Sequence, residues 1–448
     1  MSGKSETQPR DLTVPAVVLA LLSCLPVLVA RYPQMSDYPA HLARYAIMLD
    51  GGRSADLAQW YVFRWKWTGN VGVDLLIHPF AALFGVETGA RAIAGLIPPL
   101  TGLGIVHVDR ALRGRTGIGS LLALPFIWSP MMLIGLLNFA LGLALALHAF
   151  ALWVRLEGRG WRPIAFVPIG LVVWACHMSA WGVLGIMVAG HEFARHGWRA
   201  ALLRPLPLAA PLVPMLVLGG NSGAFSYGPF WWIYKEAIWK RAMRDQSQWL
   251  DIGCLCLYAA LLLAALWYRR VDGRLGWSAL LLLLLSWIVP RHVSGGDYVD
   301  YRMITSGLLL AALAIDWPAA PRFAALLAPA PYLVRLAVTT LAWQADSATT
   351  TRLLTALDHV PRGARVASAV LVPAGSWPLD HFEHIGAWAV LRRHALVNAN
   401  FAVRDIHMLS LRHGGWSDPS QRILQLVDKP VDLASFGPAR DADYLWYV

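Results

Sequence analysis

Residues 36–44, Ser-Asp-Tyr-Pro-Ala-His-Leu-Ala-Arg, include the side chains whose types and spacing best suit chemistry. Asp37 and His41 are four positions apart, so they share one face of a helix if that helix begins at Pro39. A carboxylate in partly dehydrated surroundings can act as a general base that accepts a proton from an attacking hydroxyl group. Alternatively, Asp37 only caps the helix and His41 lies at an interface. The sequence therefore offers Asp37 as a candidate base and His41 as a candidate binding residue.

His177 is a further candidate, because it lies between Cys176 and Met178 where two apolar runs join. At such a junction the imidazole can point into a cavity and bind a phosphate or a sugar. Ionisable residues within membrane segments are candidate functional groups. The alternative is a polar group that is simply satisfied within a helix bundle.

The composition indicates a membrane protein. Of the 448 residues, 57% are hydrophobic and 15% are charged, against about 25% charged residues in an ordinary soluble domain. The net charge is +11, but the arginines form short clusters between apolar runs rather than a basic stripe, so no nucleic-acid partner is expected. The four cysteines lie in or beside apolar runs without the usual partners of a metal site, and no metal ligand is assigned.

Apolar runs recur from the N-terminus to residue 343. Because a bilayer core about 30 Å thick needs roughly 20 apolar residues per helix, the sequence predicts about eleven membrane spans. They fall at residues 12–30, 88–109, 117–131, 132–154, 163–177, 178–194, 205–219, 250–268, 276–290, 303–316 and 322–343. The expected fold is an all-α polytopic membrane bundle over residues 1–343.

The distribution of positive charge predicts which loops face the cytoplasm. The first apolar run follows Lys4 and Arg10 but lacks a small-x-small cleavage site, so it is expected to remain as a signal anchor. With the N-terminus in the cytoplasm, clusters of arginine fall inside, at residues 110–115, 155–162, 195–204 and 269–274. An odd number of spans then leaves residues 31–87 and the tail 344–448 outside. We therefore expect a multi-pass protein of a bacterial-type cytoplasmic (inner) membrane.

Three predicted outer segments are too polar for lipid and too long for turns: residues 31–87, 220–249 and 291–302. Within them, stretches 71–84 and 227–241 combine apolar or aromatic residues with charges, as interfacial helices do. In the tail 344–448, strand patterns near the start and the end predict a small α/β or α+β domain. The tail contains no nucleotide loop or catalytic triad, so acceptor contact or packing is its expected role.

Together these features resemble the GT-C superfamily of membrane glycosyltransferases, including its mannosyltransferase and aminoarabinose-transferase architectures. The similar features are the signal anchor, the outer loop that opens with Asp37, the interfacial helix and the soluble outer tail. Two later motifs also look similar, Gly135-Leu-Leu-Asn-Phe-Ala-Leu-Gly at the fourth span and Asp300-Tyr-Arg302 before the tenth. The resemblance covers the whole chain at the level of architecture, and Asp37 is its most specific position.

The resemblance implies an enzyme that takes its sugar from a polyprenyl phosphate held among the membrane lipids. Asp37 matches the acidic residue that deprotonates or orients the acceptor while the sugar is transferred with inversion. The acceptor would be a glycan, a lipid or a protein outside the cytoplasm. Some members have paired acidic residues or a metal-binding acidic motif here, whereas this chain has Asp37-Tyr38 followed by His41. No cofactor is expected, and dependence on a divalent metal is left open.

A polyprenyl-phosphate donor needs cations near the outer interface, which hold its phosphate and stabilise the charge of the leaving group. Candidate binding residues are therefore Arg44, Lys235, Lys240, Arg241, Arg291 and Arg302, together with Asp300, His41 and His177. Each of the cations could equally be an ordinary interfacial anchor. Arg302 is preferred because Asp297 and Asp300 lie close to it in the sequence.

Two other classes of protein fit part of the sequence. A bundle of about eleven helices can also form a transporter or a lipid flippase, but transporters tend to have two related halves with charges near the midplane. This chain has no convincing internal repeat, and its ionisable residues concentrate at the predicted outer rim. A polysaccharide polymerase or ligase would need a large late outer loop, whereas residues 291–302 form a short one.

Overall fold

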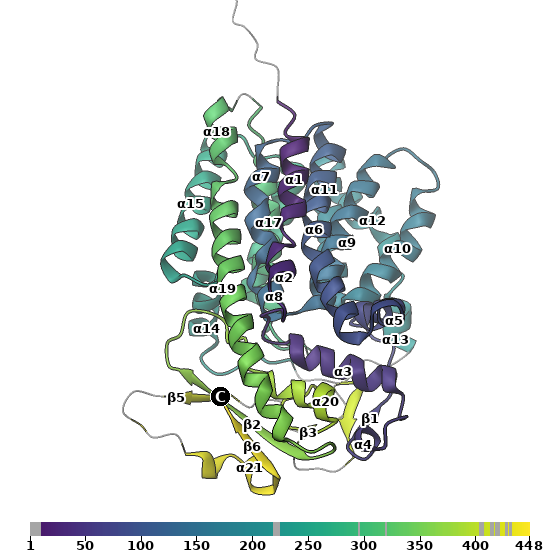
Figure 1. Cartoon of the computed structure of the whole chain (residues 1–448). Coiled ribbons are helices and arrows are strands. Elements are labelled where there is room, and N and C mark those ends of the chain that lie inside the picture. The colour runs from purple at the N-terminus through teal and green to yellow at the C-terminus, as the bar shows by residue number, and fades with distance from the viewer. Residues whose placement is uncertain are drawn as a thin grey trace, which may run out of the picture.

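In the computed structural model, helices form a bundle, and short strands gather at one end of it (Figure 1). The chain begins at the end of the bundle that lies opposite these strands (Figure 1). The structure describes residues 10–217, 225–293, 296–318, 320–402, 407–412, 416, 422–425, 429 and 432–448.

The bundle consists of apolar helices that pack side by side. The most extensive contacts join α6 to α9, and α16 to both α11 and α17. The bounds of the bundle helices are α1 (Thr13–Leu22), α2 (Leu25–Val29), α6 (Val86–Arg113), α7 (Ile118–Ala123), α8 (Pro130–Ile134), α9 (Leu137–Arg155), α10 (Arg162–Cys176), α11 (Met178–His196), α12 (Trp198–Leu203), α13 (Leu212–Val217), α15 (Gln248–Trp267), α16 (Gly273–Ile288), α17 (Val299–Ala314), α18 (Arg322–Leu327) and α19 (Ala330–Leu354).

Four helical segments of the described chain are long and apolar enough to cross a membrane: Val86–Arg113, Leu137–Arg155, Gln248–Trp267 and Arg322–His359. The prediction of about eleven full-length spans is therefore too high by this measure. The other apolar runs form helices that are shorter, interrupted or more polar. The protein is nevertheless mostly helical, as the sequence predicts.

Prolines interrupt two of the predicted spans. The run 117–131 becomes α7, a 3₁₀ turn at Leu124–Trp128 and α8, and both the turn and α8 have proline in their first two positions. The described part of the run 205–219 becomes a 3₁₀ turn at Leu206–Ala209 followed by α13. Proline lacks an N–H group and clashes with the preceding turn, so a regular α-helix does not continue through it. The prediction of unbroken spans there is wrong for this reason.

The first of the three predicted outer segments crosses the end of the bundle as α3 (Tyr38–Asp50), which lies between the bundle helices and the strands (Figure 1). Asp37 immediately precedes α3, but its side chain makes no capping hydrogen bond. The capping role that the sequence allowed for Asp37 is therefore not used.

The predicted interfacial stretches are both helical. Stretch 71–84 forms α5 (Gly72–Phe84), which packs against α6. Stretch 227–241 contains α14 (Trp231–Lys240). Between α3 and α5 lie the short helix α4 (Ala55–Ala58) and the strand β1 (Tyr61–Phe63).

The C-terminal strands form a parallel sheet around β2 (Arg365–Pro373). β2 pairs in parallel with β3 (Leu396–Val397), β5 (Arg422–Gln425) and β6 (Tyr444–Tyr447). Parallel neighbours need crossover connections, and α20 (Trp388–Arg393) lies in the connection from β2 to β3. The strands predicted near the start and the end of the tail are confirmed as β2 and β6.

Several contacts tie the C-terminal strands to the rest of the chain. β1 pairs antiparallel with β4 (Leu409–Leu411), so segments from opposite ends of the chain share a two-stranded sheet. α19 continues past the predicted boundary at residue 343 to Leu354, and links the bundle to the sheet (Figure 1). The guanidinium of Arg244 donates hydrogen bonds to three successive main-chain carbonyls, at residues 376–378. These contacts fix the C-terminal region over the end of the bundle.

Candidate functional site

A cavity of about 370 Å³ lies where the bundle meets the C-terminal region. Its walls come from the start of α3, the start of α9, the junction of α10 with α11, and the start of α17. Residues between 379 and 384, together with Phe401 and His407, contribute from the C-terminal region. Half of the site residues predicted from the sequence line this cavity: Asp37, His41, Arg44, His177 and Arg302.

The backbone around Gly135 holds Asp37 in place. The N–H of Asp37 donates to the carbonyl oxygen of Ile134 at 2.7 Å, and Gly135 follows with a φ of +98°. A Cβ at position 135 would lie 3.4 Å from the Cβ of Asp37 and 3.2 Å from the Cβ of Met35. Glycine therefore permits both the left-handed backbone and the close approach of the two segments.

The carboxyl group of Asp37 is largely enclosed, with its side chain 16% exposed. Burial raises the pKa of this carboxyl group well above its usual value, and the charges of Glu383 and Asp297 raise it further. The guanidinium of Arg302 lowers the pKa of Asp37, but by less than burial raises it. A carboxylate with a raised pKa is a stronger proton acceptor once it is ionised, which suits a general base.

Arg302 brings a buried positive charge to the cavity from α17. The residue is 5% exposed, and its Nη1 lies 3.5 Å from the hydroxyl oxygen of Ser179. The guanidinium also lies over the ring of Phe139, 5.6 Å from the centroid. Its Nε is buried without a hydrogen-bond partner in the part of the chain that the structure describes. A buried cation in this state favours binding of an anion.

The carboxylates closest to Arg302 in the sequence are paired with other cations. Lys235 lies 2.7 Å from Asp300, and both side chains are buried. Lys235 also donates to two main-chain carbonyls of the segment that ends α16. Arg291 lies 2.8 Å from Asp297 and holds it with two hydrogen bonds. Asp297 and Asp300 are therefore each held by another cation, while their charges still act on Arg302.

Two of the other predicted cations, Lys240 and Arg241, lie on the surface. Lys240 pairs with Glu236 one helical turn away, and both side chains are exposed. Arg241 is exposed as well, and its main-chain carbonyl accepts a hydrogen bond from Tyr301. The predicted site residues that do not line the cavity are thus Lys235, Lys240, Arg241, Arg291 and Asp300.

Arg44 lines the cavity, but its charge is paired with Asp74. Its Nη2 lies 2.9 Å from an oxygen of Asp74, and both residues are buried. Asn138 donates to the same carboxylate at 3.2 Å and accepts from the N–H of Val73 at 2.6 Å. This network joins α3, α5 and α9, so Arg44 stabilises the wall of the cavity and presents a compensated charge.

His177 lies at the junction of α10 and α11. Its Nδ1 accepts a hydrogen bond from the N–H of Ser179 at 3.0 Å, which caps α11. Because Nδ1 accepts, the neutral ring carries its proton on Nε2, which is then available as a donor. The histidine therefore has a structural role in α11 and also lines the cavity, so the two interpretations of this residue are compatible.

Several cavity residues were not predicted from the sequence: Asp380, Glu383, His384, Phe401 and His407 of the C-terminal region, and Arg244 of the second outer segment. One sequence signal points to the first three, because the run 380–384 reads Asp-His-Phe-Glu-His and concentrates titratable side chains. Arg244 and His407 have no comparable local pattern around them. Only the folded arrangement identifies those two.

Three histidines surround the ring of Phe401 in the cavity. The rings of His41, His384 and His407 have centroids 4.9, 5.0 and 5.5 Å from it. Burial lowers the pKa of His384 and of His407 to about 4, and the pKa of His41 well below its usual value. Neutral imidazoles each donate one hydrogen bond and accept one. Sugar hydroxyl groups have the same capacity, and Nδ1 of His41 is buried without a hydrogen-bond partner among the described residues, so it suits a sugar hydroxyl group.

Among the residues that the structure describes, no group of three or more His, Cys, Asp or Glu side chains is arranged to hold a metal ion. The cavity nevertheless contains several carboxyl groups. The expectation of a site without a cofactor stays a prediction, and metal dependence is a question for the transfer assay.

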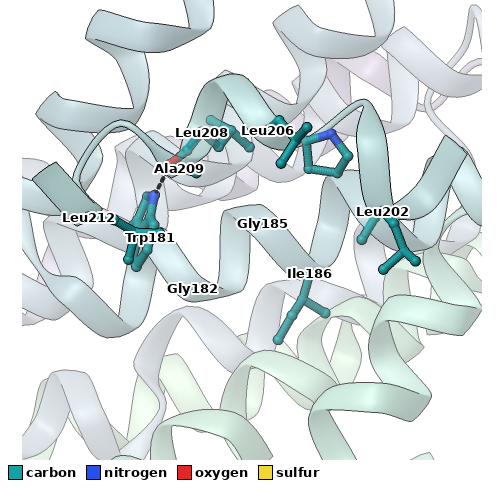
Figure 2. Close-up of a pocket in the computed structure, with 11 residues that line it drawn as sticks. Trp181, Gly182, Gly185, Ile186, Leu202, Leu206, Leu208, Ala209 and Leu212 are labelled. Atoms are coloured by element: carbon teal, nitrogen blue, oxygen red, sulfur yellow. Dashed lines mark hydrogen bonds between the residues drawn. The ribbon is translucent and has the colours of Figure 1, made fainter. Parts of the chain in front are cut away.

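A second hollow, of about 390 Å³, lies between α11 and the segments from α12 to α13, and Figure 2 shows its lining. Gly182 and Gly185 leave open space on α11, and leucines of the facing segments complete the hollow. The indole nitrogen of Trp181 donates to the main-chain carbonyl of Leu208 at 2.7 Å (Figure 2). None of the lining residues is titratable, so this hollow offers no group for catalysis.

Comparison of the chain with protein-family models, with curated proteins and with solved structures finds no match. The function is therefore inferred from the residues, geometry and charges of the first cavity.

Proposed function

We propose that the protein is a membrane glycosyltransferase of the GT-C type, which transfers a sugar from a polyprenyl-phosphate donor to an acceptor outside the cytoplasm. The observation that carries this proposal is the meeting of Asp37 and Arg302 at one cavity. Asp37 is an enclosed carboxyl group with a raised pKa, and Arg302 is a buried cation. The proposed reaction needs a base for the acceptor and a cation for the leaving phosphate.

In the proposed reaction, the carboxylate of Asp37 takes the proton of an acceptor hydroxyl group while the acceptor oxygen attacks the anomeric carbon. The bond between that carbon and the phosphate oxygen breaks, and its electron pair stays on the polyprenyl phosphate. Arg302 stabilises this charge, and Arg244 is a second candidate because it lines the same cavity. Attack opposite the phosphate inverts the anomeric configuration without a covalent enzyme intermediate.

The proposal places the helical bundle in a cytoplasmic membrane, with the N-terminus inside and the C-terminal region outside. Its support is that arginine-rich loops gather where the described chain begins. Asp11 pairs with Arg110 at that end, and Arg113 contacts both Asp272 and Asp316. The C-terminal region lies at the opposite end of the bundle (Figure 1). Interrupted helices are compatible with a membrane where neighbouring helices satisfy their backbone groups.

The test is transfer of radiolabelled sugar by membranes that contain the protein, with a panel of polyprenyl-phosphate sugars as donors. The proposal expects transfer from at least one donor, and a product whose anomeric configuration is opposite to that of the donor. A product with retained configuration would contradict direct displacement. Movement of a lipid across reconstituted vesicles, without transfer from any donor, would favour a flippase instead.

A further inference from the structure

The C-terminal region contributes a second group to Asp37. His384 lies in the run 380–384, and its Nε2 is 3.7 Å from Oδ1 of Asp37. The residue is 4% exposed, so it has little contact with solvent. Catalytic contacts in structures without substrate are often long and tighten when substrate binds. The contact therefore joins the proposed base to the opposite end of the chain.

The other ring nitrogen determines the tautomer of His384. Its Nδ1 lies 2.8 Å from the main-chain carbonyl oxygen of Ala399. A carbonyl oxygen can only accept a hydrogen bond, so Nδ1 carries the proton and donates it. In the neutral ring, Nε2 is then an unprotonated acceptor, and this is the atom nearest to Asp37.

We propose that His384 is the positioning residue of Asp37, and that its Nε2 accepts a hydrogen bond from the carboxyl group once Asp37 has taken the proton of the acceptor hydroxyl group. This inference rests on the function proposed above. The acceptor O–H bond breaks, its proton passes to Asp37, whose new O–H donates to Nε2 of His384, and the acceptor oxygen forms its bond to the anomeric carbon. The polyprenyl phosphate leaves with the electron pair of the broken bond. Asp37 releases the proton to water when the products leave.

Other charged groups face this pair, and they determine how it titrates. Glu383 and Asp297 raise the pKa of Asp37, and Arg302 lowers it. The charge of Asp380 raises the pKa of His384, against the larger effect of burial. Because interacting groups titrate together, one pH midpoint cannot be assigned to one residue. The test therefore compares variants that differ in a single contact.

The variant His384→Asn distinguishes the roles of the two ring nitrogens. Its amide can still donate to the carbonyl of Ala399, but it is too short to reach Asp37. We expect the transfer rate to fall about tenfold or more, because general acid–base partners contribute at least this much. The acid limb of the pH profile should also move to lower pH, since Asp37 loses a neutral acceptor that favours its protonated form.

His381→Asn is the matched control. His381 belongs to the same run, but it lies 3.7 Å from Asp346 of α19 rather than beside Asp37. Its pH profile should be that of the wild type. A His384→Asn protein whose rate and pH profile both match the wild type would show that His384 is only structural.

A second measurement does not depend on sugar transfer. Infrared difference spectra over an acid titration, compared with those of Asp37→Asn protein, identify the carboxyl band of Asp37. The band should titrate at lower pH in His384→Asn protein than in the wild type. An unchanged titration would overturn the pairing even where transfer occurs. A shifted titration in a protein that transfers no sugar would retain the pairing and reject the proposed function alone.

Discussion

The charge of Arg302 distinguishes this cavity from an ordinary polar pocket. Burying a cation is costly unless it is paired, and two of the three carboxylates that act on Arg302, Asp297 and Asp300, are held more closely by Arg291 and Lys235. Arg302 therefore remains available to a ligand, and a phosphate in the cavity would offset the cost of its burial. At the residue scale, this buried cation and the enclosed carboxyl group of Asp37 are the features that argue for group transfer.

Replacing Arg302 with glutamine should reduce transfer by about 100-fold or more, the order expected when one preorganised group that stabilises developing charge is lost. Arg302→Lys should keep part of the activity, because it retains the charge without the planar fork of donors. Lys240→Gln is the control, since Lys240 is exposed and pairs with Glu236. Initial rates of transfer measure these effects. Equal losses in the Arg302→Gln and Lys240→Gln proteins would contradict the role of Arg302.

The pH dependence of wild-type transfer should report the titration of Asp37. The base must lose its proton before it can act, and burial raises the pKa of this carboxyl group well above 3.8. Transfer should therefore be low in acid and rise with pH, with a midpoint above the usual range of a carboxyl group. Rates measured in one mixed buffer at constant ionic strength give the midpoint. A rate that is already maximal near the ordinary pKa of aspartate would contradict this account of Asp37.

At the scale of elements, the turn before α9 determines where α3 can begin. Gly135 adopts a left-handed backbone, and the carbonyl of Ile134 holds the N–H of Asp37. Three residues later, Asn138 joins the pair of Arg44 and Asp74 to the start of α5. Residues 134–138, at the start of α9, thus position both Asp37 and the pair of Arg44 and Asp74 at the cavity.

Gly135→Ala should lower the stability of the protein by about 1 kcal/mol or more, because a φ of +98° is strained for a residue with a Cβ. The added Cβ would lie only 3.2 Å from the Cβ of Met35, in the segment that leads to Asp37, so transfer should fall more than the folded fraction does. Gly182→Ala is the control, because a Cβ on this glycine of α11 meets no atom within 4 Å. Thermal unfolding in detergent and transfer rates should be measured together. Similar behaviour of both variants would contradict the strain argument.

The buried histidines should make the C-terminal region sensitive to acid. The pKa of His384 and of His407 is about 4 in the folded protein, against 6.5 for an ordinary histidine. The unfolded chain therefore binds protons first as the pH falls. Stability should be complete above about pH 6.5 and decrease toward about pH 4, by up to about 3 kcal/mol for each histidine.

Limited proteolysis of the C-terminal region at decreasing pH measures this loss of stability. His407→Phe keeps an aromatic ring beside Phe401 but removes one titrating group. Its stability should decrease less steeply with acid than that of the wild type. The same acid sensitivity in both proteins would show that His407 does not contribute.

At the scale of the whole molecule, the cavity requires both ends of the chain. The segment just before α3 supplies Asp37, and the C-terminal region supplies His384. The pairing of β1 with β4, together with the continuous helix α19, holds these distant segments against each other. Loss of the C-terminal region would therefore open the site and not merely remove a separate domain.

This dependence on long-range contacts explains what the sequence could and could not predict. Asp37 and His41 are recognisable because helical spacing and a proline put them on one face. The apolar runs are recognisable from hydropathy, although their prolines divide two of them into shorter elements. His384 is not recognisable in this way, because periodicity describes neighbours within one element and not a fold-back over the bundle.

The most direct test of the central claim is sugar transfer by Asp37→Asn protein, an almost isosteric change that removes the base. At matched expression and folding, transfer should fall about 100-fold to 10,000-fold, the range expected for loss of a general base. Asp346→Asn, which alters a half-buried carboxyl group of α19 outside the cavity, should transfer as the wild type does. Transfer at the wild-type rate by Asp37→Asn protein would remove Asp37 from the mechanism and contradict the account.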